Sequence, residues 1–195
     1  MSIMGSNHGY QPDSREVHPL NLMNHIRKTL LAVLTLTCFG LRADVSTKLT
    51  KVHLCCPGCV NAAQEAATTV KGVTFAGDKN EGTVSLTAPD AATLQKAADA
   101  LVGAGFYGTP GDAAVKLKDA PGAKGVKVQT LELSGVHLCC GKCVAAVEKA
   151  VMSVAGVKGQ TAEKNAKTFT VTGDFNDKDV VVALQKAGFA ARVGK

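Results

Sequence analysis

The chain contains two copies of one sequence unit. The segment Val52–Val60 (VHLCCPGCV) returns as Val136–Val144 (VHLCCGKCV), 84 residues later. The tripeptide Ala-Gly-Phe also occurs twice, at residues 104–106 and 187–189. Similarity that extends over about 50 residues indicates duplication of a whole folding unit rather than of one motif.

Each unit predicts the element order β-α-β-β-α-β. Apolar side chains at helical spacing follow each cysteine segment, as Val144, Val147 and Val151 illustrate, and a glycine ends each helix. The expected strands are 49–54, 73–76 and 83–88 in the first unit and 130–138, 157–161 and 168–172 in the second, with a last strand starting at Phe106 and at Phe189. The second helices are expected at 91–102 and 178–186. The prediction is an α+β fold of two ferredoxin-like βαββαβ domains in tandem, each an antiparallel four-stranded sheet with two helices on one face.

The predicted domains are residues 44–108 and 130–195. A linker rich in Gly, Pro, Ala and Lys is expected between them, at 109–129. Each unit has about 65 residues, which is near the lower limit for an independent core. Whether Ala114–Leu117 completes the first sheet stays open.

The first 43 residues are expected to be a leader and signal peptide. Arg27 and Lys28 precede an apolar run at 29–41, which is too short to span a bilayer as a helix, and cleavage is predicted after Ala43. The alternatives are an uncleaved anchor or a buried helix. The favoured interpretation predicts a secreted or periplasmic protein without stable membrane insertion after cleavage.

Composition excludes several function classes. Aromatic residues make up only 4% of the chain, and the net charge of +6 is not carried by clustered arginines, so nucleic acid is not an expected partner. No Ser-His-Asp set, carboxylate pair or phosphate-binding loop is apparent in the sequence. We therefore do not expect an enzyme of these types.

The chemistry is expected at the two CCxxC segments. Each CxxC lies where a strand ends and a helix starts, so both sulfurs can converge on one point. Free N–H groups and the helix dipole favour thiolate there. Paired thiolates are soft ligands that suit Cu(I), Zn(II) and similar ions. The candidate metal ligands are Cys56, Cys59, Cys140 and Cys143.

The βαββαβ pattern with CxxC after its first strand resembles the heavy-metal-associated domain family, over both units. The family includes copper chaperones, metal-transporting ATPases and the periplasmic mercury-binding protein. The resemblance implies that the same four cysteines are ligands and that Leu54 and Leu138 replace a buried methionine of the family motif. It also implies Cu(I) as the favoured ion and a metal-transporting ATPase or another metal-accepting protein as partner.

The departure from that family is a third cysteine in each segment, Cys55 and Cys139. A third thiolate permits trigonal Cu(I), and it also brings Zn(II), Cd(II) or Hg(II) into consideration. His53 and His137 are nearby in sequence, either as further ligands or as surface or supporting residues.

Two other interpretations of the cysteines remain. Structural disulfides suit an oxidising compartment, but three cysteines per unit leave one over. CxxC at a helix start is also the geometry of a thiol-disulfide oxidoreductase, which is the alternative function. The favoured prediction is an exported, non-enzymatic soft-metal-binding protein that acts in metal trafficking or sequestration.

Overall fold

A computed structural model describes residues 43–118, 120 and 122–194. Residues 1–42, which hold the predicted signal segment, lie outside the described part. From Arg42 to Lys195 the chain clusters as one compact unit, and that unit contains both repeats.

The fold prediction is confirmed. The first repeat folds into β1 (Val45–Thr50), α2 (Pro57–Thr68), β2 (Thr74–Asp78), β3 (Thr83–Ala88), α3 (Ala91–Gly103) and β4 (Thr109–Pro110). The second folds into β5 (Lys127–Ser134), α4 (Gly141–Met152), β6 (Val157–Gln160), β7 (Thr168–Asn176), α5 (Asp177–Lys186) and β8 (Arg192–Val193).

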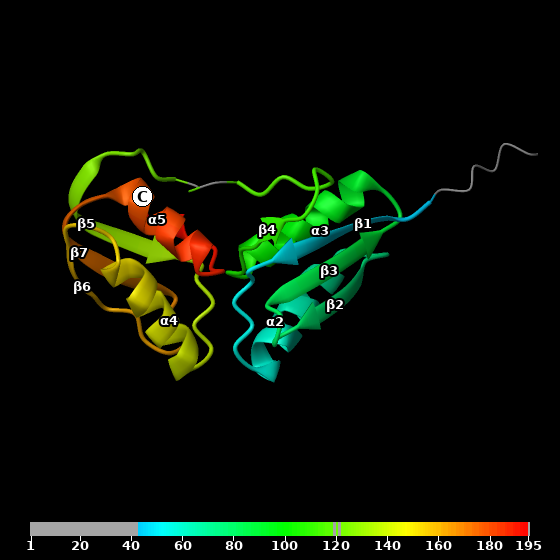
Figure 1. Ribbon diagram of the computed structural model, residues 1–195, viewed down its shortest axis with the longest axis horizontal. Helices are drawn as coiled ribbons and strands as arrows, with labels where there is room; N and C mark the ends of the chain where they lie inside the picture. The colour runs from blue at the N-terminus through cyan, green and yellow to red at the C-terminus, as the bar shows by residue number, and fades with distance from the viewer. Residues whose placement is uncertain (1–42, 119, 121, 195) are drawn as a thin grey trace, which may run out of the picture. The chain divides into compact units, whose positions relative to one another are not determined.

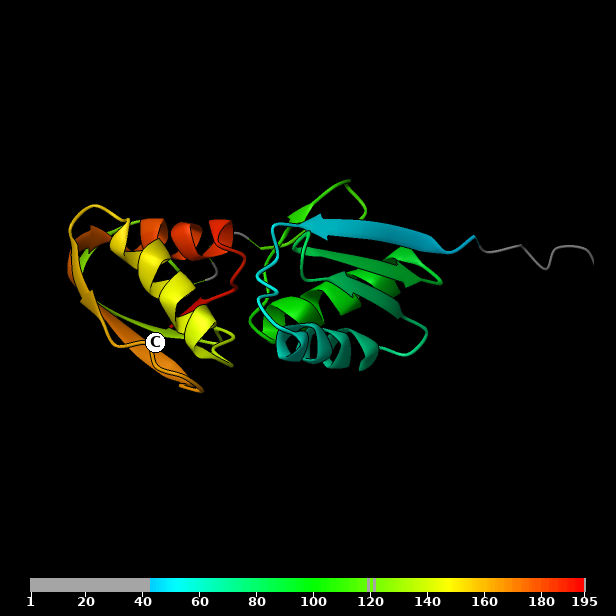
Figure 2. The ribbon, with the colours of Figure 1, turned by 60° about the horizontal axis from the view of Figure 1, so that its bottom comes forward.

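The two antiparallel sheets have equivalent strand orders, β2-β3-β1-β4 and β6-β7-β5-β8. In each repeat the two helices cover one face of the sheet (Figures 1 and 2). Each repeat is therefore a ferredoxin-like α+β domain. Among the described residues, no helix combines the length and the apolar character needed to cross a bilayer.

The core follows from the two periodicities in the sequence. In β3, every second side chain is buried, at Val84, Leu86 and Ala88. In α4 the buried residues Cys143, Val147 and Val151 recur every fourth position, which places them on one face toward the sheet. The metal-ligand candidate Cys143 thus lies on the core-facing side of its helix.

The first strand of each repeat ends earlier than predicted. β1 ends at Thr50 because Lys51 adopts a φ of 59°, in the left-handed region that interrupts a strand. Gly135 occupies the equivalent position after β5, with a φ of 71°. The histidine and cysteines that follow are therefore in an irregular segment that leaves the sheet, and this bend is what redirects them.

The last strand of each repeat differs from prediction as well. β4 and β8 begin at Thr109 and Arg192, three residues after Phe106 and Phe189. The two phenylalanines instead form an isolated antiparallel bridge with each other. Consequently β4, and not Ala114–Leu117, completes the first sheet.

The segment predicted as linker holds some regular structure. β4 lies within 109–129, and β5 begins at Lys127, three residues before the predicted start of the second domain. Val115 in this segment is buried. Part of the connection is thus packed against the domains that it joins.

Candidate metal centre

Cys56 and Cys140 are the residues at which the first helix of each repeat starts. Both have extended backbone and occupy the N-cap position, so their side chains lie beside the free N–H groups of the first turn. Pro57 follows Cys56 at a position where a helix tolerates proline. The sequence places these sulfurs at the positive ends of two helix dipoles.

The remaining cysteines flank those two. Cys59 and Cys143 lie in the first helical turn and are fully buried. Cys55 and Cys139 are half-buried on the preceding loop. Leu54 and Leu138, expected as hydrophobic supports, are buried in the core beneath the loops.

All six sulfurs converge on one place, although they come from two repeats. Within a repeat, the Cys56 and Cys59 sulfurs are 3.5 Å apart and those of Cys140 and Cys143 are 3.8 Å apart. Across the repeats, the Cys59 sulfur lies 3.4 Å from that of Cys139. The four predicted ligands and the two additional cysteines are thus parts of one cluster rather than of two distant sites.

The six cysteines are free thiols. Sulfurs in a disulfide are about 2.05 Å apart, and the shortest sulfur–sulfur distance here is 3.4 Å. The structural-disulfide interpretation has no support in this arrangement.

The helix starts favour thiolate at the first cysteine of each CxxC. The N–H of Cys143, together with the Cys55 thiol, lowers the pKa of Cys140 to about 6. The N–H of Cys59 is the main cause of a lowered pKa at Cys56. The expectation of an acidic thiol at each helix start agrees with these two cysteines.

Burial has the opposite effect on other members of the cluster. It raises the pKa of Cys55 to about 12, with a hydrogen bond to Cys140 as the next cause. Burial likewise raises the pKa of Cys139 and of Cys143. The lowered pKa values at the two helix starts and the raised values at the other cysteines favour ionisation at Cys56 and Cys140 before the rest of the cluster.

The two histidines lie at the junction of the repeats. The His53 ring stacks on Phe189 with ring centroids 4.3 Å apart, and the His137 ring lies 4.4 Å from Phe106. Their Nε2 atoms are buried without a hydrogen-bond partner. His53 also offers a nitrogen within 4.8 Å of the Cys55 and Cys143 sulfurs. Within the described ranges, His137 belongs to no comparable group of three possible metal ligands.

Sequence reasoning missed the residues that join the repeats. The Gly188 carbonyl accepts hydrogen bonds from the N–H groups of His53 and Tyr107, and the Gly105 carbonyl accepts one from Ala190. Gly105 and Gly188 have φ values of 94° and 88°. The sequence carries a signal for them, because Ala-Gly-Phe is repeated in both units, but the tripeptide by itself predicts a helix end followed by a strand.

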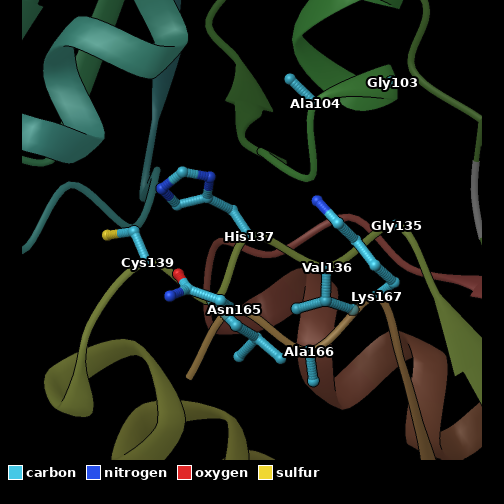
Figure 3. Close-up of a pocket in the computed structure, with 10 residues that line it drawn as sticks. Gly103, Ala104, Gly135, Val136, His137, Cys139, Asn165, Ala166 and Lys167 are labelled. Atoms are coloured by element: carbon cyan, nitrogen blue, oxygen red, sulfur yellow. The ribbon is translucent and has the colours of Figure 1, made fainter. Parts of the chain in front are cut away.

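A pocket of about 470 Å³ opens beside the cluster. Figure 3 shows His137 and Cys139 on its wall, with the Lys167 side chain extending into it. Gly103 and Ala104 of the first repeat also line the pocket. One side of the Cys139 loop is therefore open to solvent and to small solutes.

The donor set fits a soft cation. Six sulfurs, with one histidine nitrogen near them, are the ligands that select Cu(I) and Zn(II) over hard ions such as Mg²⁺. Every member of the cluster lies within 4 Å of another sulfur, which is the spacing of ligands around one ion or a few bridged ions.

Comparison with known proteins agrees with this chemistry. The heavy-metal-associated domain matches residues 130–190. A copper-exporting P-type ATPase of Vibrio cholerae is 36% identical over 66 residues, which are 33% of this chain and 7% of the ATPase. The chain thus spans a small part of the length of that relative.

Two solved structures resemble parts of the chain. The N-terminal domain of PacS from Synechocystis PCC6803 is 26% identical and is covered completely by 35% of this chain, with a TM-score of 0.31. Oxidized MerP from Ralstonia metallidurans is 28% identical and is 97% covered by 34% of this chain, with a TM-score of 0.30.

The match covers most of the second repeat, including its CCxxC segment. Residues 130–190 of this chain match the heavy-metal-associated domain family.

Proposed function

We propose that this chain is an exported protein that binds soft metal ions, Cu(I) in preference, and acts in their trafficking or sequestration through its two CCxxC segments. The observation that carries the proposal is the convergence of six free cysteine sulfurs at two helix starts. Among soft ions, the name of the Vibrio relative favours copper.

The first repeat is proposed to be a second heavy-metal-associated domain. It shares the CCxxC segment and the strand order of the second repeat. A metal-transporting ATPase, or another protein that presents thiolates, is the proposed partner. The half-buried sulfurs, which are those of Cys55, Cys56, Cys139 and Cys140, are the ones that such a partner could reach.

Export is proposed from the sequence of the leader alone. N-terminal sequencing of the protein recovered from outside the cytoplasm tests this part separately. Asp44 as the first residue supports it, and residues before Asp44 would refute cleavage after Ala43.

The metal-binding proposal is tested by titrating the reduced, anaerobic protein with Cu(I) against bathocuproine. Wild-type protein is expected to compete with the chelator. A variant with Ser at Cys56, Cys59, Cys140 and Cys143 is expected to lose this ability. Unchanged affinity in that variant would refute the assignment.

A further inference from the structure

The third cysteine of each segment contacts the opposite repeat. The Cys55 sulfur lies 3.4 Å from that of Cys140 and 3.5 Å from that of Cys143. Reciprocally, the Cys139 sulfur lies 3.4 Å from that of Cys59 and 3.9 Å from that of Cys56. Each third cysteine thus contacts both sulfurs of the CxxC pair in the other repeat.

We propose that the six cysteines form one polynuclear Cu(I) site shared by the repeats, in which Cys55 and Cys139 each bind an ion together with cysteines of the opposite repeat. This inference rests on the proposed function and goes beyond it, because one ion at each of two independent CxxC pairs would satisfy that function equally well.

The sulfurs fall into four sets of three, and every sulfur belongs to two sets. Three of these sets have all their sulfurs within 4.8 Å of one another. The fourth set has sulfur–sulfur distances of 3.5, 3.6 and 3.9 Å. The sets are Cys55-Cys56-Cys140, Cys56-Cys59-Cys139, Cys139-Cys140-Cys143 and Cys55-Cys59-Cys143.

This pattern is that of an octahedron of sulfurs with an ion at alternate faces. An ion with metal–sulfur bonds of about 2.3 Å keeps three surrounding sulfurs about 4 Å apart, and the sulfur–sulfur distances of 3.4 to 3.9 Å are close to that value. With an ion in each set, every sulfur bridges two ions and every ion has three sulfurs, so the site holds four ions.

The three-sulfur sets favour Cu(I) over Zn(II). Structural zinc sites are almost always four-coordinate and tetrahedral, whereas Cu(I) is satisfied by a small number of soft thiolates. Loading involves no redox step: each cysteine that is still protonated releases its proton to solvent, and four Cu(I) with six thiolates leave a net charge of −2. The N-terminal ends of α2 and α4 lie against this anionic site.

The junction between the repeats has the close backbone packing that a shared site requires. A Cβ atom on Gly105 would lie 2.7 Å from the Gly135 carbonyl oxygen, and one on Gly188 would lie 2.5 Å from the Lys51 carbonyl oxygen. Both contacts are with backbone of the opposite repeat, immediately before its cysteine segment. Side chains at these glycines would force the repeats apart and separate the sulfurs.

The first test is native mass spectrometry of the reduced, anaerobic full chain during titration with Cu(I), together with the luminescence typical of shielded polynuclear Cu(I)-thiolate clusters. Wild-type protein is expected to pass from the metal-free form to the four-ion form with few intermediates, and to luminesce. The Cys55→Ser/Cys139→Ser variant keeps both CxxC pairs, so it is expected to bind about two ions without luminescence.

The second test separates the repeats without touching a sulfur. Gly105→Ala/Gly188→Ala is expected to bind about two ions, like the cysteine variant. Its matched control is Gly72→Ala/Gly125→Ala, since those glycines also have positive φ but meet no atom closer than 3.5 Å. The control is expected to load like wild-type protein, and circular dichroism verifies that all variants fold.

Two results would overturn the shared site while leaving the proposed function intact. One is saturation of wild-type protein at two independent, non-luminescent ions. The other is four-ion loading that persists in the Cys55→Ser/Cys139→Ser variant. Failure of wild-type protein to bind Cu(I) at all would instead refute both proposals.

Discussion

The sulfur of Cys55 lies 3.4 Å from the sulfur of Cys140, although the two residues are 85 positions apart in the chain. This contact connects the loop of one repeat to the helix start of the other. It gives the extra cysteine of the CCxxC motif a structural explanation, because Cys55 contacts both sulfurs of the CxxC pair in the opposite repeat.

The same contact predicts the reactivity of the metal-free protein. The pKa of Cys140 is lowered to about 6, whereas burial raises the pKa of Cys143. Iodoacetamide is therefore expected to alkylate Cys140 from mildly acidic pH upward, well below the usual cysteine pKa of about 8.5, and to leave Cys143 largely unmodified. Trypsin cleavage after Lys142 separates the two cysteines, so peptide mass spectrometry measures each one.

Cys55→Ala is the matched variant for this experiment. Removal of the Cys55 thiol takes away a hydrogen bond that stabilises the Cys140 thiolate, so the alkylation midpoint of Cys140 is expected to rise. A midpoint at the ordinary cysteine value in wild-type protein, or no response to Cys55→Ala, would contradict the cross-repeat contact.

The stacked histidines predict acid sensitivity of the junction. Burial lowers the pKa of His137 and, with the charge of His137 as a second cause, that of His53. Above about pH 6.5, the pKa of histidine in an unfolded chain, both histidines are neutral in the folded and in the unfolded protein. As the pH falls below this value, the histidines of the unfolded chain take up protons more readily than those of the folded chain. The free energy of unfolding of the metal-free protein is therefore expected to decrease from about pH 7 to about pH 5.5.

Urea unfolding of wild-type protein and of His53→Phe/His137→Phe at both pH values measures this effect. Phenylalanine keeps an aromatic ring at the junction and removes the titration. The double variant is expected to show a weaker pH dependence, with a remainder from Cys140, whose pKa of about 6 lies in the same pH range. An equal slope in the two proteins would show that these histidines are not a source of it.

Asp177 predicts a stability effect remote from the cysteines. Its carboxylate accepts hydrogen bonds from the N–H groups of Lys124, Gly125 and Val126, at 2.8 to 3.0 Å. Burial alone would raise the pKa of this carboxyl group, but the three donors outweigh burial and hold the pKa below its ordinary value. The carboxylate thus connects the end of the 109–129 segment to the start of α5 by hydrogen bonds.

Asp177→Ala is expected to reduce the free energy of unfolding by about 1–3 kcal/mol, because three N–H groups lose a charged acceptor. The effect should shrink as the pH falls below about 4, where the unfolded carboxyl group becomes protonated. Asp179→Ala, at an exposed position in the same helical turn, is the control. Equal stability of the two variants in urea would contradict the role of Asp177.

The oxidoreductase alternative makes an opposite prediction in a simple assay. If the cysteines serve metal binding, the reduced protein should not catalyse the reduction of insulin by dithiothreitol above the uncatalysed rate. A thioredoxin-like rate, lost in Cys56→Ser and Cys140→Ser variants, would favour the alternative.

Much of the fold could be predicted from the sequence because each repeat carries local signals. Valines at helical spacing, alternating apolar residues and helix-ending glycines predict the elements and their order to within a few residues. The early end of β1 was not predictable in this way, because Lys51 has a side chain and gives no sign of its left-handed backbone.

The relation between the repeats could not be predicted from periodicity. Duplication predicts two copies of a unit, but the pairing of Phe106 with Phe189 depends on contacts between segments far apart in the chain. The sequence identifies the six cysteines one by one, and it shows that Cys55 and Cys139 are additions to the CxxC motif. It does not predict the contacts between repeats that bring all six sulfurs together, because these also depend on segments far apart in the chain.

The central claim is that these sulfurs bind a soft cation, and elemental analysis of natively purified, anaerobically handled protein tests it most directly. Copper, or another soft metal held in proportion to protein and released by Cys→Ser substitution at the six positions, is the predicted result. Protein that carries no copper, zinc, cadmium or mercury, and takes up none after full reduction, would contradict the account.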